Sequence, residues 1–267
     1  MIVPVDDAGD PRLDDYRDLS DRNARGRRGL FVGESALVVA RMLALPGVTK
    51  SVLVSNSALD RIVPSAPDGV PVYAAPPPLL EAVAGFDVHR GVLAVGRRAP
   101  FEGRLPREVV PAAGAACVLA CEGIGNVDNM GLLFRNAAAF GVAAVLLDPT
   151  SHDPLYRKSL RVSIGHALTV PWARVPDWPG GLLALASERD LVVLGAAPGR
   201  QAHAIDDVEP PQRCVLIVGA EGAGLAPATL ACCRRLVRVP MAPGVDSLNV
   251  AVAAAVCLHH LCRCGRA

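Results

Sequence analysis

The chain has 267 residues, of which 51% are hydrophobic, and this is ample apolar material for two buried cores rather than for a disordered protein. Its formal net charge of +1 means that only local basic clusters, and not the overall charge, can indicate a nucleic-acid partner. No apolar run approaches the roughly 18 residues that a membrane-spanning helix needs. Residues 1–10 carry three aspartates and no basic residue, unlike a signal peptide. We therefore expect a cytoplasmic protein without a membrane partner.

The N-terminal part of the chain predicts a small α/β domain. Residues 30–34 form an apolar run that predicts a strand, and apolar residues at helical spacing follow over 36–43. Further strands are predicted at 48–55, 70–74 and 88–95. Residues 100–111 contain three prolines, one glycine and four charged residues, and they are the best candidate for a linker. These signals divide the chain into a first domain at 1–105 and a second domain at 112–267.

A cluster of basic residues lies near the N-terminus. Its members are Arg22, Arg25, Arg27 and Arg28, all within seven residues. Guanidinium groups at this density are candidate phosphate contacts, and they would supply the local positive charge that the chain as a whole lacks. A solvated basic loop is the alternative interpretation, and the residues alone do not decide between the two.

The second domain begins with alternating strand and helix signals. Residues 115–121 predict a strand, residues 129–140 a helix and residues 142–147 a second strand. Two strands separated by a helix form a βαβ unit, in which the strands are parallel. We therefore expect an α/β domain built on a parallel sheet.

Three segments of this domain combine polar residues with tight bends. In the first, Asn129 and Gly131 open the predicted helix and Arg135 follows one turn later. In the second, an apolar run over 214–218 ends in three glycines around Glu221. In the third, the loop 239–249 carries prolines and a glycine and runs into a helix of small residues, which Ser247 or Asn249 could cap. Each segment alone also fits an ordinary turn or a capped core helix.

A dinucleotide-binding protein is the main alternative for the start of this domain. Residues 118–128 read as a strand, a Gly123-x-Gly125 turn and a helix. Asp128 stands where the third glycine of that fingerprint belongs, and a carboxylate there would repel a pyrophosphate. The sequence therefore disfavours this interpretation.

In this order, the three segments resemble the motifs of the SpoU/TrmH family of S-adenosylmethionine-dependent RNA 2′-O-methyltransferases, in the SPOUT superfamily. The matching residues are Asn129-x-Gly131-x-x-x-Arg135-Asn136-Ala137, then Gly219-x-Glu221-x-x-Gly224-Leu225, then Pro240-Met241 followed by Ser247-Leu248-Asn249-Val250. Pro243 stands where family members often carry glycine, and the glycine follows at position 244. The resemblance implies a C-terminal SPOUT domain with a parallel sheet and a trefoil knot. It also implies a small N-terminal α/β domain, similar to ribosomal protein L30e, that binds the RNA substrate.

The resemblance also implies an activity and a set of site residues. The activity is methyl transfer from S-adenosylmethionine to a ribose 2′-hydroxyl of ribosomal or transfer RNA by a homodimer. Residues expected to contact the cofactor are Gly219, Glu221, Gly224, Val239, Met241 and Leu248. Residues expected in catalysis are Arg135, Asn129, Ser247 and Asn249, and those expected to bind RNA are Arg22, Arg25, Arg27, Arg28 and Arg161. A catalytically inactive RNA-binding protein of the same fold is the alternative function.

Arg135 is the first candidate among these residues. A guanidinium can fork onto the phosphate next to the target ribose, and it keeps its proton at neutral pH. We therefore expect it to anchor and polarise rather than to act as a base. Structural roles as caps and turn braces stay open for Glu221, Ser247 and Asn249, and an exposed helix position stays open for Arg161.

Cysteine usage predicts no metal site. The eight cysteines are at 117, 121, 214, 232, 233, 257, 262 and 264. They lie largely in apolar segments and form no pair of Cys-x-x-Cys motifs, so buried free thiols are expected. The pair at 262 and 264 would supply only two ligands.

Overall fold

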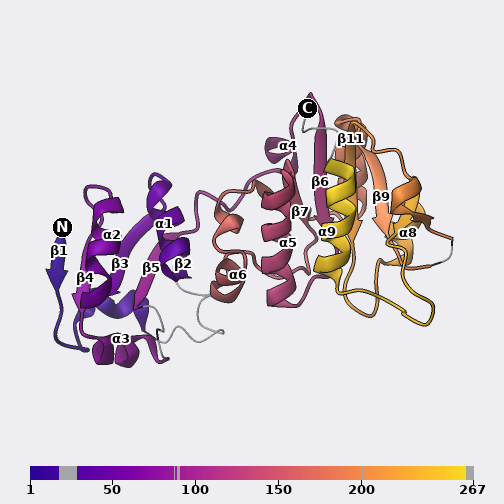
Figure 1. Ribbon diagram of the computed structural model, residues 1–267. Coiled ribbons are helices and arrows are strands. Elements are labelled where there is room, and N and C mark those ends of the chain that lie inside the picture. The colour runs from indigo at the N-terminus through magenta and orange to yellow at the C-terminus, as the bar shows by residue number, and fades with distance from the viewer. Residues whose placement is uncertain (18–28, 87, 89–90, 200, 263–267) are drawn as a thin grey trace. The chain divides into compact units, whose positions relative to one another are not determined.

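The computed structural model describes residues 1–17, 29–86, 88, 91–199 and 201–262 (Figure 1). The chain forms two compact units. The first comprises Met1–Glu102 and Leu155–Leu168, and the second comprises Gly103–Pro154 and Thr169–Ala267. The segment 100–111 contributes apolar side chains to both. Phe101 packs edge-on against Phe31 in the first unit, and Val109 and Val110 are buried in the core of the second.

The first unit is built on a five-stranded mixed sheet. Its strands are β1 (Ile2–Pro4), β2 (Leu30–Glu34), β3 (Thr49–Ser55), β4 (Val72–Ala75) and β5 (Val92–Arg97). The strand order is β1-β4-β3-β5-β2, and β5 runs antiparallel to both of its neighbours. Its helices are α1 (Ala36–Ala44), α2 (Leu59–Ile62), α3 (Pro77–Ala84) and α6 (Arg157–Val162). Although α6 follows part of the second unit in sequence, it packs against β2.

The two longer helices of this unit cover opposite faces of the sheet. Leu80 of α3 belongs to a core cluster with Val32 and Leu53. On the other face, a Cβ atom at Gly33 would lie 2.3 Å from the Sδ atom of Met42 in α1. Because successive strand residues point to opposite faces, Val32 and Gly33 place the two helices on different sides.

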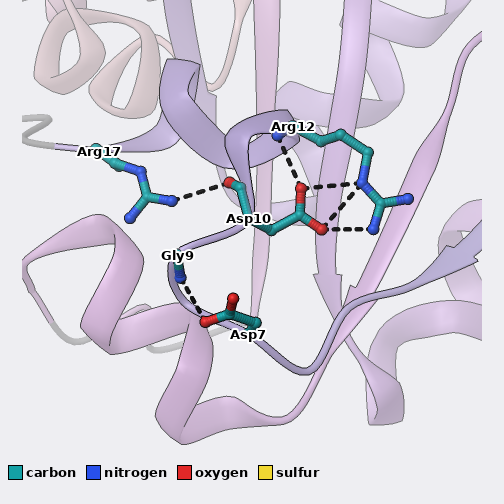
Figure 2. A network of polar contacts seen from close by, with 5 residues as sticks. All are labelled: Asp7, Gly9, Asp10, Arg12 and Arg17. Atoms are coloured by element: carbon teal, nitrogen blue, oxygen red, sulfur yellow. Dashed lines mark hydrogen bonds and ion pairs between the residues drawn. The ribbon is translucent and has the colours of Figure 1, made fainter.

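A network of polar contacts fixes the N-terminal loop of the first unit (Figure 2). Asp10 accepts hydrogen bonds from the Arg12 backbone at 2.8 Å and from its guanidinium, and these lower the pKa of the Asp10 carboxyl to about 2. Asp10 thereby caps a short 3-10 helix (Pro11–Tyr16), and Arg17 donates back to the Asp10 carbonyl. The buried Tyr16 hydroxyl bonds Ser51 at 2.7 Å. Neither this helix nor β1 was predicted from the sequence.

The second unit is built on a seven-stranded sheet. Its strands are β6 (Ala116–Cys121), β7 (Ala144–Leu147), β8 (Trp172–Arg174), β9 (Val192–Ala196), β10 (His203–Ala204), β11 (Arg213–Val218) and β12 (Arg235–Arg238). Their order is β10-β12-β9-β11-β6-β7-β8, and every pairing is parallel. The parallel sheet predicted for this domain is confirmed.

Helices cover both faces of this sheet. They are α4 (Pro106–Val109), α5 (Val127–Phe140), α7 (Gly180–Glu188), α8 (Pro227–Cys232) and α9 (Val250–Leu261). Side chains of α4 and α7 share one core cluster with Val118 and Ala120 of β6. The helices α5 and α9 lie side by side (Figure 1) and contact β7 and β11, respectively. Asn136 of α5 donates a 2.8 Å hydrogen bond to the Ala251 carbonyl in the first turn of α9.

No helix in the described ranges is long and apolar enough to cross a membrane. Those same residues include no group of three or more His, Cys, Asp or Glu arranged to hold a metal ion. Seven of the cysteines carry free thiols, three of them buried.

Candidate active site

A cavity of about 640 Å³ opens at the carboxyl ends of β9, β11 and β12, beside the start of α9. This edge of a parallel sheet is where α/β proteins commonly bind ligands. The cavity is lined by all six residues expected to contact the cofactor and by two of those expected in catalysis: Gly219, Glu221, Gly224, Val239, Met241, Leu248, Ser247 and Asn249. The second and third motifs therefore meet at one site.

The loop after β11 closes on itself too tightly for larger residues. Gly224 donates to the Ala220 carbonyl at 2.9 Å and adopts a φ of +66°. A Cβ atom at Gly219 would lie 2.3 Å from the carbonyl carbon and oxygen of Gly224, closer than real Cβ contacts allow. Glycine at 219 is thus a steric requirement of this backbone approach.

The loop before α9 ends at a capping residue. Gly244 adopts a φ of +83° in a turn closed by a 3.2 Å hydrogen bond from Val245 to Ala242. Asn249 is the N-cap, and its side-chain oxygen accepts from the backbone nitrogens of Ala251 at 2.9 Å and Val252 at 3.3 Å. These bonds satisfy two of the free donors at the helix start.

The side-chain nitrogen of Asn249 connects all three motifs. It donates to Asn129 Oδ1 at 2.9 Å and to Glu221 Oε1 at 2.8 Å. Asn129 is buried in the first turn of α5, whereas Glu221 lies in the glycine loop after β11. Capping and long-range contact are therefore functions of the same amide group.

A second loop braces the start of the first motif. Ser151 Oγ accepts from the Ile124 backbone nitrogen at 3.1 Å, and the His152 backbone donates to the Ile124 carbonyl at 2.7 Å. Asp148 is buried at the base of this loop and accepts from Ser151 at 2.7 Å. Arg174 donates to the Asp148 and Ser151 carbonyls at 2.9 and 3.0 Å. This brace was not predicted from the sequence, although an Asp three residues before a Ser after a strand is a turn signal.

Arg135 does not line the cavity. Its side chain is exposed on α5, and the adjacent Asn136 bonds the first turn of α9. The helix that carries Arg135 is therefore tied to the cavity at two points, through Asn129 and through Asn136.

The cavity is also lined by three polar residues that were not predicted as site residues from the sequence. They are Arg238 at the end of β12, Asp246 in the loop before α9, and Cys257 in the second half of α9. Burial raises the pKa of the Cys257 thiol to about 12, so this thiol is neutral. Asp246 lies in the loop of the third motif, directly before Ser247, and this position was the only signal for it in the sequence.

Of the five arginines expected to bind RNA, only Arg161 lies within the described residues. Arg22, Arg25, Arg27 and Arg28 lie outside the described residues. Arg161 is in the first unit, where its guanidinium donates to Glu34 at 3.3 Å and its side chain stays 45% exposed. Arg157 bonds the same carboxylate at 2.5 Å, and its guanidinium lies 4.1 Å from the centre of the Phe86 ring.

The parallel α/β fold and the three joined motifs define a class of protein, the RNA methyltransferases, and comparison with known sequences agrees. The sequence model of the SpoU rRNA Methylase family matches residues 116–259. The chain is 40% identical over 272 residues to an uncharacterized tRNA/rRNA methyltransferase of Mycobacterium bovis, covering 99% of this chain and 93% of the relative. It is 30% identical to the 23S rRNA (guanosine-2′-O-)-methyltransferase RlmB of Bordetella pertussis, covering 85% of this chain and 94% of that protein. The chain therefore belongs to the SpoU rRNA methylase family.

Solved structures show the same fold. The SpoU methyltransferase AviRb of Streptomyces viridochromogenes, in complex with AdoMet, has a TM-score of 0.79 and 25% identity, covering 96% of this chain and 99% of AviRb. An AdoMet-bound rRNA methyltransferase of Sinorhizobium meliloti has a TM-score of 0.83 at 19% identity, covering 100% and 99% of the two chains. The predicted family is confirmed, and S-adenosylmethionine is supported as the cofactor.

Proposed function

We propose that this protein transfers a methyl group from S-adenosylmethionine to a ribose 2′-hydroxyl of ribosomal or transfer RNA. The observation that carries the proposal is the pair of hydrogen bonds from Asn249 to Asn129 and Glu221, because they join the three motifs beside one cavity. The 2′-hydroxyl as target is supported by RlmB, whose name specifies guanosine 2′-O-methylation.

The residues of the cavity fit the proposed cofactor. A volume of about 640 Å³ is within the ordinary range for small-molecule sites. Gly219 and Gly224 bring the backbone close to the bound group, Val239, Met241 and Leu248 supply apolar walls, and Glu221 adds a carboxylate. When bound, S-adenosylmethionine supplies a methyl group made electrophilic by its sulfonium. The protein has to exclude water from that group and to hold the attacking hydroxyl in line with it.

Four polar residues have proposed roles next to this cavity. Arg135 forks onto the RNA phosphate beside the target ribose and orients the hydroxyl, and the hydroxyl proton leaves to water. Asn129 and Asn249 hold the three motifs in register through their shared hydrogen bond. Ser247 contributes a hydroxyl to the cavity wall. Catalysis is therefore mainly a matter of positioning.

We assign RNA binding to the proposed L30e-like domain over 1–105 and to Arg161, which belongs to the same compact unit. Arg22, Arg25, Arg27 and Arg28 supply phosphate contacts in this proposal. Arg161 adds another, because one hydrogen bond to Glu34 leaves other donors of its half-exposed guanidinium available. Weakened RNA binding with a smaller salt dependence in an Arg161→Ala variant would support the assignment.

The proposed assembly is a homodimer in the cytoplasm, in which residues of one subunit complete the site of the other. The outward face of α9 supports it, because Val252 and Val256 are 49% and 39% exposed. A molecular mass of two chains in light scattering is the expected result. The proposed fold of the second unit also includes the trefoil knot, with 239–249 as part of the threaded loop, and a cofactor-bound crystal structure tests it.

Methyl transfer to RNA tests the proposed function directly. The protein is incubated with total RNA and S-adenosylmethionine labelled on its methyl group, and the sites of 2′-O-methylation are mapped with and without the protein. New 2′-O-methyl sites support the proposal. RNA binding without transfer would support the inactive RNA-binding alternative, and base methylation would overturn the ribose target.

A further inference from the structure

Three charged side chains line the cavity, and they differ in how far their polar atoms are already hydrogen-bonded. Glu221 accepts the 2.8 Å hydrogen bond from Asn249. Arg238 uses its Nε to donate to the Ala202 carbonyl at 3.0 Å, which leaves its terminal nitrogens available. Asp246 has no hydrogen bond or ion pair to any part of the chain that the structure describes. The cavity therefore presents one free carboxylate and one oriented guanidinium.

We propose that Asp246 selects the sulfonium form of the cofactor and that Arg238 holds the carboxylate of its amino-acid end. This inference rests on the proposed function, because it takes S-adenosylmethionine as the occupant of the cavity. It assigns separate electrostatic roles to two residues that are not among the matching residues of the three motifs.

Charge complementarity is the reason for assigning Asp246 to the sulfonium. S-adenosylmethionine carries a sulfonium, an ammonium and a carboxylate, so its net charge is one unit positive. Loss of the methyl group leaves a neutral thioether in S-adenosylhomocysteine, and the net charge falls to zero. The lining of the cavity has one more carboxylate than guanidinium. A free carboxylate therefore favours the methyl donor over the spent product, which helps the product to leave.

Geometry is the reason for assigning Arg238 to the carboxylate. The Ala202 carbonyl fixes the Nε edge of the guanidinium at the end of β12. The terminal nitrogens of a guanidinium match the two oxygens of a carboxylate in a fork. A side chain held in this way loses little conformational freedom when the ligand binds.

Calorimetric binding of three ligands tests both assignments independently of turnover. The ligands are S-adenosylmethionine, S-adenosylhomocysteine and decarboxylated S-adenosylmethionine. Asp246→Asn should weaken S-adenosylmethionine binding about five- to tenfold and change S-adenosylhomocysteine binding less than about twofold. Arg238→Gln should weaken binding of the two ligands that have a carboxylate by a similar factor and leave the decarboxylated ligand unaffected. Equal losses for all ligands, or no loss, would overturn the inference.

Matched controls separate this inference from the proposed function. Asp207→Asn and Arg235→Gln change the same charges at exposed positions of the second unit that do not line the cavity, and neither should alter any affinity. Failure of the wild-type protein to bind S-adenosylmethionine would contradict the proposed function itself. Normal wild-type binding with an unchanged ligand preference in Asp246→Asn would contradict only the role of Asp246.

Discussion

The Nδ2 atom of Asn249 lies 2.8 Å from the Oε1 atom of Glu221, so one side-chain hydrogen bond joins the loop before α9 to the loop after β11. The same nitrogen bonds Asn129 at 2.9 Å, a residue 120 positions away in the sequence. The other end of this amide caps α9. Asn249 therefore has two functions, capping α9 and joining the loops, and a single substitution can distinguish them.

Asn249→Asp should keep the helix cap and lose the connection. An aspartate oxygen still accepts from Ala251 and Val252, but its second oxygen cannot donate and faces the Glu221 carboxylate. We expect the free energy of unfolding to fall by about 1–2 kcal/mol and S-adenosylmethionine binding to weaken about tenfold or more. Asn249→Ala should lose the cap as well, at an additional cost of about 1 kcal/mol. Chemical denaturation and calorimetry measure both effects.

Asn126→Asp is the matched control for that substitution. Asn126 caps α5 with its side-chain oxygen, which accepts from Asp128 at 2.8 Å and Asn129 at 3.2 Å. The same change there should be nearly neutral for cofactor binding. Equal losses in the two variants would show that the donor of Asn249 has no special role.

Gly219→Ala should prevent the close approach in the loop after β11. Its Cβ would meet the Gly224 backbone at 2.3 Å, and backbone cannot move aside as a flexible side chain can. A shift of the loop should cost about 1–3 kcal/mol and reduce cofactor affinity accordingly. Gly125→Ala is the control, because no atom of the described residues lies within 4 Å of its added Cβ. Cofactor binding unchanged in Gly219→Ala would contradict the tight packing of this loop.

Arg135→Ala should abolish methyl transfer while leaving cofactor affinity nearly intact. Its side chain is exposed on α5 and does not line the cavity, so its removal should disturb the RNA and not the cofactor. Leu248→Arg should abolish both, since Leu248 forms part of the cavity wall. Single-turnover transfer and calorimetry are the two measurements. Full turnover by Arg135→Ala would rule out its proposed role.

Asp148 should make the brace beside the first motif sensitive to acid. Burial raises the pKa of this carboxyl, but hydrogen bonds from Ser151 and Thr150 outweigh it, and the pKa is lowered overall. A lowered folded-state pKa gives stability that is present above the unfolded value of about 3.9 and is lost as the pH falls through the folded value. Asp148→Asn should therefore reduce stability at pH 7 by about 1–2 kcal/mol and flatten the loss of stability below about pH 4. Urea denaturation across pH 3–7 would reveal an undiminished slope if another group were responsible.

Ser35→Gly should stabilise the first unit. Ser35 precedes α1 with a φ of +88° and a ψ of 150°, a region that is essentially confined to glycine. Relief of this strain should add about 1–2 kcal/mol to the free energy of unfolding. Ser65→Gly, at an exposed position with ordinary backbone, should be neutral or slightly destabilising. Thermal denaturation of the two variants side by side tests the difference, and destabilisation by Ser35→Gly would contradict the strain.

Local patterns in the sequence predicted much of the second unit. The helix of small residues expected after the loop 239–249 spans Val250–Leu261 in the structure, because an asparagine cap and a run of small apolar residues specify a helix through near neighbours alone. The apolar runs that became β6, β7 and β11 are similarly explained by burial on both faces of a parallel sheet. The N-terminal strand β1 and its 3-10 helix escaped prediction because both are short and are stabilised by partners distant in sequence, such as Ser51 for Tyr16.

By itself, the sequence determined the family, the parallel sheet and the residues of the three motifs, since spacing within each motif is a local property. Only the tertiary structure decided that Asn249 bonds both Asn129 and Glu221, that Leu155–Leu168 packs with the first unit, and that Arg238 and Asp246 line the cavity. The physical reason is that these contacts depend on strand order and on which segments share an edge of the sheet. Residues far apart in the chain meet at that edge, and no periodic pattern in the sequence predicts these contacts.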